Sequence, residues 1–238
     1  MHAAAFEVIE AMRALAARGR SVLTETLAPG AAPEQALCQA WTHYPPDDLF
    51  APERGGLAYY HAHSADERAP DEHGHFHLFA SPHRAPVLER RSFVHLLGVS
   101  LDALGQPIRL FTTNRWVTDE SWRAAPAVLR LASRFELPGR KPSRALNRWL
   151  SALPTLFRPQ LEFLLARRDA KIQAHIIRRQ HRRPAETASK ARAHVLEDRS
   201  VHVLSQCRID LHKQILAIEH ALAVRAGHQR ARQGLRTA

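Results

Sequence analysis

A chain of 238 residues, 45% of them hydrophobic, can bury a substantial core, which excludes a wholly disordered protein. With only 2 cysteines it cannot form a disulfide framework, as expected for a reducing compartment. The first twenty residues include Glu7 and Glu10 and have no uninterrupted apolar run, so we expect neither a signal peptide nor a membrane span. These features predict a cytoplasmic protein with no membrane partner.

The net charge of +11 is unevenly distributed. Residues 138–238 contain 21 Lys and Arg against 7 Asp and Glu, whereas residues 1–137 contain 13 against 16. A basic C-terminal region attracts polyanions because binding releases their counterions, so nucleic acid is one predicted partner. Arg also far outnumbers Lys, which fits the coding bias of a GC-rich genome and requires no partner.

Two helices are predicted before the first strand. Apolar residues at helical spacing, from Phe6 to Leu15, indicate an amphipathic helix that ends near Gly19. A second, short helix is predicted from Pro33 through Leu37 to Trp41, because proline suits a first helical turn. Residues 43–48 contain two consecutive prolines, which favour an extended or turning path.

Four strands are predicted next, at Leu57–His63, Gly74–Ala80, Phe93–Leu101 and Ile108–Asn114, because these runs are rich in aromatic, β-branched and apolar residues. A short loop at residues 102–107 joins the last two. Connections of this length favour antiparallel pairing, since a parallel crossover needs a dozen or more residues. The sequence therefore predicts a small antiparallel meander of about four strands.

Helices are predicted after Trp116. The first follows a cap at Asp119 or Ser121 and closes at Gly139, and the second spans Arg144–Leu153 and ends at Pro154. Two long helices, at residues 159–180 and 188–226, are separated by a break at Pro184. We expect them to form a C-terminal helical hairpin that packs on the sheet or on a second copy, as a homodimer.

The predicted fold class is therefore α+β, with the sheet region at residues 1–137 and a basic helical region at 138–238 packed on the same domain.

Histidines alternate along the first two predicted strands. Because successive side chains in a strand point to opposite faces, His61 and His63 share one face of their strand. His73, His75 and His77 share a face of the next, while Phe76 and Leu78 point the other way and supply burial. Cross-strand partners lie about 4.5–5.5 Å apart at Cβ, so imidazoles from neighbouring strands could bind one metal ion. The predicted ligands are His61, His63, His75 and His77.

Such a site suits Zn, Fe, Ni or Mn and leaves a position open for water or a small-molecule substrate. Glu67 or His95 would be a further ligand or the general base, with Asp71 also within reach. Arg115, at the end of the fourth strand, could pair with a carboxylate or phosphate of the substrate. Metal-dependent hydrolysis or oxygen chemistry is the first functional hypothesis. The alternative is that these histidines are polar residues on the solvent face of a sheet, and that the protein is a non-enzymatic basic helical module that binds nucleic acid or a protein partner.

Two known motifs resemble this region. The spacing of Gly55, His61, His63, Glu67 and Gly74 is similar to the first cupin motif, in which two histidines and a glutamate bind a metal. The stretch His73-Gly74-His75-Phe76-His77-Leu78-Phe79 resembles the histidine triad of nucleotide hydrolases and transferases. That second resemblance implies a phosphoryl or nucleotidyl hydrolase with His75 as the nucleophile.

At a broader level, residues 44–168 resemble a bacterial domain family of unknown function. The resemblance rests on Tyr59-Tyr60-His61-Ala62-His63, on Gly74-His75-Phe76-His77 and on Thr113-Asn114-Arg115-Trp116-Val117-Thr118. It implies that the histidine pairs are shared by the family, and it implies no activity.

Two further clusters lie in the basic region. His194, Asp198 and His202 are spaced four residues apart, which could bind metal on one helical face or form an ordinary solvated surface. The run Arg178-Arg179-Gln180-His181-Arg182-Arg183 could contact phosphates, or it could stabilise the C-terminal end of a helix.

Overall fold

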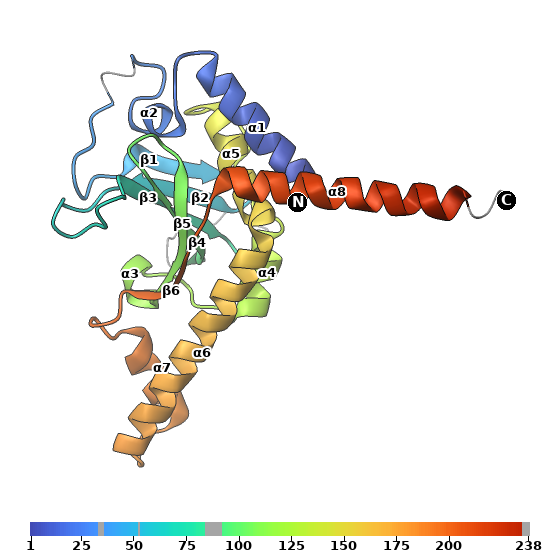
Figure 1. Ribbon diagram of the computed structural model, residues 1–238. Coiled ribbons are helices and arrows are strands. Elements are labelled where there is room, and N and C mark those ends of the chain that lie inside the picture. The colour runs from blue at the N-terminus through green and yellow to red at the C-terminus, as the bar shows by residue number, and fades with distance from the viewer. Residues whose placement is uncertain (33–35, 52, 84–91, 235–238) are drawn as a thin grey trace.

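One sheet of six antiparallel strands lies at the centre of the computed structural model, which describes residues 1–32, 36–51, 53–83 and 92–234. Each strand pairs with the next one along the chain (Figure 1). The strands are β1 (Tyr44–Ala51), β2 (Gly56–His61), β3 (Gly74–Ala80), β4 (Val94–Leu101), β5 (Pro107–Thr113) and β6 (Val203–Arg208). The predicted α+β class and antiparallel meander are confirmed, with six strands in place of four.

The four predicted strands correspond to β2, β3, β4 and β5, in the expected order. The predicted loop between β4 and β5 is closed by the Asp102 carboxylate, which accepts hydrogen bonds from the backbone N–H groups of Leu104 and Gln106. Gly105 adopts a positive φ of 79° in this loop, a conformation that glycine tolerates at little cost. Residues within the loop itself therefore determine how β4 connects to β5.

β1 was predicted only as an extended or turning path. Its Pro45 and Pro46 argue against a central strand, but prolines are tolerated at a sheet edge. β1 pairs with β2 alone, and its register shifts between Tyr44 and Leu49, where the prolines lie. This strand shields one edge of the sheet.

β6 replaces the middle of the long helix predicted at residues 188–226, so that prediction was wrong. Helix α7 ends at Leu196, the chain then forms β6 beside β5, and helix α8 begins at Leu211. Ser205 accounts for part of this outcome, because its hydroxyl bonds to that of Thr112 at 2.7 Å and donates to the Leu164 carbonyl at 2.8 Å. The helix had been predicted because the spacing of Leu204 and Leu211 fits one face of a helix, and that spacing alone was misleading. The basic C-terminal region thus completes the sheet.

The described residues form eight helices beside this sheet. They are α1 (His2–Ala16), α2 (Val22–Leu27), α3 (Arg115–Thr118), α4 (Ala125–Ala132), α5 (Arg144–Leu156), α6 (Arg158–Arg182), α7 (Ala188–Leu196) and α8 (Leu211–Gly234).

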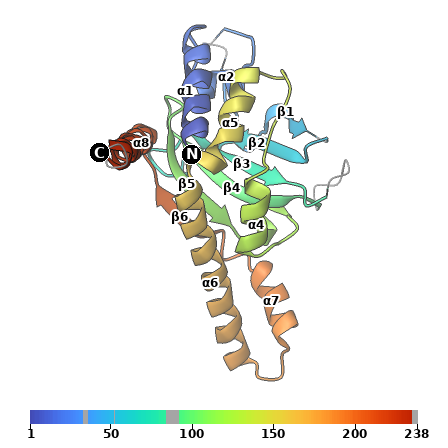
Figure 2. The same ribbon diagram turned by 90° about the vertical axis from the view of Figure 1, so that its right-hand side faces the viewer.

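The first predicted helix is confirmed as α1. The second was wrong, because residues 36–41 form no helix, whereas α2 lies earlier; Pro33, its predicted start, lies outside the described residues. α5 continues three residues past its predicted end, with Pro154 inside it. α6 and α7 form a hairpin that extends away from the sheet (Figure 2), so the predicted hairpin of two long helices is replaced by one with a short second arm.

The main hydrophobic core lies between the sheet and the layer that contains α1, α4, α5 and α6 (Figures 1 and 2). Phe76 and Leu78 point into it and are fully buried, as the alternation along β3 predicted. Their face of the sheet also meets Trp149 of α5, whose ring lies 6.3 Å from that of Phe76. One face of the sheet is thus used for the core, which leaves the opposite face for the histidines.

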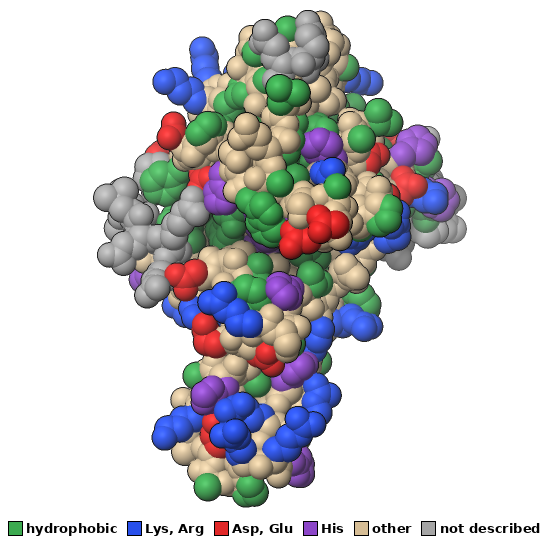
Figure 3. Space-filling view, turned by 90° about the vertical axis from the view of Figure 1, so that its left-hand side faces the viewer, with side chains coloured by type: hydrophobic (Ala, Val, Ile, Leu, Met, Phe, Trp, Pro, Cys, Tyr) green, Lys and Arg blue, Asp and Glu red, His purple; other side chains and the backbone are tan. Residues whose placement is uncertain are grey.

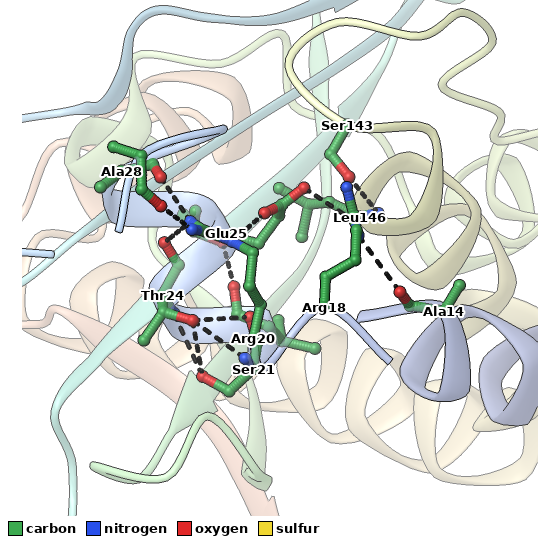
Figure 4. A network of polar contacts seen from close by, with 12 residues as sticks. Ala14, Arg18, Arg20, Ser21, Thr24, Glu25, Ala28, Ser143 and Leu146 are labelled. Carbon is green, nitrogen blue, oxygen red and sulfur yellow. Dashed lines mark hydrogen bonds and ion pairs between the residues drawn. The ribbon is translucent and has the colours of Figure 1, made fainter. Parts of the chain in front are cut away.

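A buried ion pair holds the turn between α1 and α2 (Figure 4). The Arg20 guanidinium contacts the Glu25 carboxylate and donates to the carbonyls of Thr24, Ala28 and Ala31. Arg18 approaches the other oxygen of Glu25 at 3.1 Å. Burial of these charges is tolerated because the Arg20 side chain is surrounded by acceptors.

Across the described part of the chain, every helix is too short or too polar to cross a lipid bilayer.

Candidate metal centre

Three histidines converge on the face of the sheet opposite the core. His61 of β2 is the direct cross-strand partner of His75 of β3, and His77 follows two residues later on the same face. One ring nitrogen from each of the three lies within 4.8 Å of the others. The Nε2 atoms of His61 and His75 are 2.7 Å apart. The pairing of β2 with β3 that the sequence predicted is what brings these imidazoles together, and the group could hold a metal ion.

These imidazoles are not on a solvent face. His75 and His77 are only 6% and 2% exposed, and His61 is partly buried. Burial lowers the pKa of His61 and His77 well below the ordinary value, and the neighbouring histidines lower it further. Both rings are therefore neutral near pH 7, which is the form that binds metal. The alternative of ordinary polar residues facing solvent does not fit this burial.

Glu72 orients His75. The Nδ1–H of His75 donates to Glu72 Oε1 at 2.7 Å, and the other carboxylate oxygen accepts from Arg109 at 3.1 Å. Burial alone raises the pKa of Glu72, but the bond from His75 and the charge of Arg109 bring it below its usual value, so the group is a carboxylate. With Nδ1 held by Glu72, the Nε2 of His75 points toward His61. Carboxylates commonly fix metal-binding histidines in this way.

His95 of β4 orients His77 in a similar way. His77 Nδ1 lies 3.0 Å from His95 Nε2, and His95 Nδ1 lies 3.5 Å from the Thr113 hydroxyl. If each Nδ1–H donates along this row, the Nε2 of His77 keeps its lone pair free. Burial, with a smaller effect from Arg168, lowers the pKa of His95 to about 3, so this ring is also neutral.

A cavity of about 370 Å³ opens beside the three histidines. Its walls include Trp41, Phe111 and Trp116 around the imidazoles, together with charged side chains such as Glu72 and Arg109. The ring of Phe111, a residue of β5, lies over Gly98 of β4. A Cβ added to Gly98 would come within 2.3 Å of this ring. A side chain at this position would therefore displace an aromatic wall of the cavity. The size and apolar lining suit a small organic molecule.

The other predicted site residues lie around this group. His63 stacks on Trp41 with ring centroids 4.3 Å apart, and its centroid is 5.1 Å from that of His75. Glu67 lines the cavity and accepts a hydrogen bond from the Ser64 hydroxyl at 2.5 Å. His95 lies behind His77, as described above.

Arg115 is outside the residues that line the cavity. It pairs instead with Glu197 and with Asp119, whose carboxylate lies 3.4 Å from the guanidinium. Asp71, a further acidic candidate, is held by Arg109 at 3.2 Å and by Arg208 at 2.5 Å. His73 lies apart from His75 and His77, because it precedes β3 and bonds to the Tyr60 hydroxyl at 2.7 Å.

The sequence did not single out Glu72, Arg109 or Trp41. Glu72 is three residues from His75, a spacing that could have suggested a carboxylate beside the imidazole. Arg109 and Trp41 reach the site through strand pairing and through the loop before β1, and no local pattern marks them. The metal-like spacing of His194, Asp198 and His202 does not produce one helical face, since α7 ends at Leu196.

Comparison with known proteins identifies a family but no activity. A family model described as a domain of unknown function (DUF6969) matches residues 2–209. The match is wider than the range of 44–168 expected from the sequence, and it includes all three clustered histidines. No curated protein and no solved structure matches the chain.

Proposed function

Because the chain belongs to the family of the domain of unknown function DUF6969, whose description names no reaction, we propose its function from the histidine group itself. His61, His75 and His77 bind one divalent metal ion, and the protein acts on a small molecule in the adjoining cavity. The observation that supports this most is that three ligand nitrogens lie within 4.8 Å of one another beside a cavity of about 370 Å³. Three protein ligands leave a coordination position for water or substrate, as in catalytic zinc sites.

The partners of the histidines strengthen the proposal. Glu72 and His95 each occupy the Nδ1 side of a proposed ligand and thereby direct its Nε2 toward the shared centre. A metal ion there would lower the pKa of a bound water and supply a hydroxide near neutral pH. Glu67 and His63 line the same cavity and are the proposed groups to accept a proton or to act as a further ligand. Hydrolysis is therefore the reaction class we favour, with oxygen chemistry as the alternative if the metal is iron.

Two other ideas from the sequence draw less support. In a histidine triad, His73 would lie beside His75. His73 instead bonds to the Tyr60 hydroxyl and lies apart from His75, so the triad draws less support than the metal site. The predicted role of Arg115 in binding substrate is weakened by its pairing with Glu197 and Asp119 outside the cavity lining.

Elemental analysis of tag-free protein tests the proposal. We expect close to one Zn, Fe, Ni or Mn per chain, and loss of that metal in His75→Ala and His77→Ala. His83→Ala is the matched control, because His83 is an exposed histidine outside the group. Reconstitution with cobalt would report the ligand set through its visible absorption spectrum. A metal content below about 0.2 per chain, unchanged by the two variants, would contradict the proposal.

A further inference from the structure

A second, separate cavity lies in the hairpin of α6 and α7. This crevice has a volume of about 330 Å³, and its lining is mostly polar. Four arginines and two histidines line it, with one acidic residue, Asp198. Figure 3 shows Lys, Arg and His side chains gathered on the narrow lower lobe formed by this end of the molecule. The crevice is concave and preformed, unlike a simple run of charges on a helix.

Three of the four arginines form no salt bridge among the described residues, although Arg183 lies close enough to Glu186 to lower its pKa. Arg179 is neutralised by Glu186, with its Nε and Nη2 atoms 2.6 and 3.0 Å from the two carboxylate oxygens. Arg178, Arg182 and Arg183 form no salt bridge or side-chain hydrogen bond within the described ranges. Their guanidinium groups thus remain available to a ligand.

Asp198 offsets only part of this charge, because one carboxylate faces the three arginines that Glu186 does not pair with. Its Oδ1 already accepts from the hydroxyl and the backbone N–H of Ser200, at 2.6 and 3.0 Å. The pKa of His175, at the inner side of the crevice, is lowered by burial and then by the charges of Arg178 and Lys171. A positive potential therefore persists inside the crevice, and it favours an anion.

We propose that this crevice binds the diphosphate group of a small molecule. Guanidinium groups form paired hydrogen bonds with phosphate oxygens, and arginine is the usual residue for this recognition. The three arginines exceed Asp198 by two positive charges, and one phosphate monoester, at about −1.5 to −2, would already balance them. A diphosphate offers more oxygens for paired hydrogen bonds with three guanidinium groups and uses more of the concave space. The lining of the crevice contains no Trp, Tyr or Phe side chain on which a nucleic-acid base could stack, so the small anion is favoured over a nucleic acid.

Inorganic pyrophosphate is the probe, titrated calorimetrically into the tag-free full chain with phosphate and sulfate for comparison. We expect saturable binding with one site, and tighter binding of pyrophosphate than of phosphate or sulfate. Arg178→Ala combined with Arg182→Ala should weaken it, by roughly ten- to hundredfold for each charged hydrogen-bonding residue lost. Both residues are exposed, so the double variant should keep the melting temperature of the parent protein.

Two controls separate this site from others. Arg192→Ala removes one arginine charge from α7 at an exposed position outside the crevice and should leave binding unchanged. His75→Ala combined with His77→Ala removes two of the proposed metal ligands and should also leave it unchanged, which makes this inference independent of the metal centre.

Three outcomes would overturn the inference. The first is an absence of saturable pyrophosphate binding at low ionic strength. The second is equal weakening by Arg192→Ala and by the double arginine variant, particularly with tighter binding of duplex DNA, because it would indicate an extended polyanion surface. The third is loss of binding in the histidine variant but not in the arginine variant, because pyrophosphate would then be a ligand of the metal centre.

Discussion

At the scale of single residues, the candidate centre depends on two pairs of groups, Glu72 with His75 and His95 with His77. In each pair a neighbour holds the Nδ1 side of an imidazole, so the orientation of the ring is fixed before any metal binds. Such preorganisation matters because a freely rotating histidine must lose rotational freedom when it binds. The partners should therefore affect metal affinity without contacting the ion.

Glu72→Gln provides the first test of this arrangement. The amide keeps the size of the side chain but loses the negative charge that holds the His75 Nδ1–H and pairs with Arg109. We expect the metal affinity to fall by about 10- to 100-fold while the fold is retained. A competition titration against a chromophoric chelator measures this change. Glu162→Gln is the matched control, since Glu162 is an exposed carboxylate of α6 outside the cavity; an equal loss in both variants would contradict an orienting role for Glu72.

At the scale of elements, much of the sheet could be predicted from the sequence because strand alternation and apolar runs are local signals. β2 to β5 follow from such runs, and the short β4–β5 loop follows from Asp102 and Gly105. The same alternation predicted that His75 and His77 share one face of their strand. For His61 to join them, β2 and β3 had only to be neighbours, as they are.

The elements that were missed depend on contacts distant in sequence. β1 contains two prolines that only an edge position tolerates, and β6 forms because β5 offers a free edge. For the same reason Arg109, brought to Glu72 by the pairing of β4 with β5, could not be inferred from its neighbours in the chain. Where tertiary pairing decides between helix and strand, periodicity alone gives the wrong answer, as at residues 197–210.

Arg20→Met tests the connection between α1 and α2. Methionine keeps part of the packing but leaves Glu25, which is only 1% exposed, without its closest cation. An unpaired buried charge costs roughly 3–5 kcal/mol. The free energy of unfolding, measured in urea, should therefore fall by about that amount. The remaining contact between Arg18 and Glu25 should make the loss smaller.

Two further variants separate charge from packing. Arg18→Ala removes an exposed partner of Glu25 and should cost less than about 1 kcal/mol. The combination of Arg20→Met with Glu25→Leu removes both buried charges and should restore much of the lost stability. If the double variant is as unstable as Arg20→Met alone, the loss came from packing or from the carbonyls that Arg20 binds.

At the scale of the whole molecule, Glu120 links the histidine face to the helical layer. Its Oε2 accepts the backbone N–H of His95 at 2.5 Å, and it lies in the field of Arg168, a side chain buried beneath Trp122. Burial raises the pKa of Glu120 to about 8, although Arg168 acts in the opposite direction. The folded protein therefore holds a neutral carboxylic acid here near pH 7.

This proton makes the stability depend on pH. In the unfolded chain Glu120 ionises near its ordinary pKa of 4.5, whereas in the folded chain it stays protonated up to about pH 8. Its contribution to stability is therefore complete below pH 4.5 and is lost as the pH rises toward 8, by an amount on the order of a few kcal/mol. Glu120→Gln keeps an oxygen for the His95 N–H and has no proton to lose, so it should not share this decline.

Thermal unfolding of metal-free protein at intervals from pH 4.5 to 8.5 measures the effect. We expect the melting temperature of Glu120→Gln to rise relative to that of the parent protein as the pH increases, with the difference levelling off near pH 8. The difference between the two proteins is the informative quantity, because the buried histidines also change the stability below about pH 6.5, and they do so equally in both proteins. Glu162→Gln removes an exposed carboxylate from α6 and should show no such trend. Parallel curves for Glu120→Gln and the parent protein would mean that Glu120 is ionised in the folded state, with Arg168 compensating for its burial.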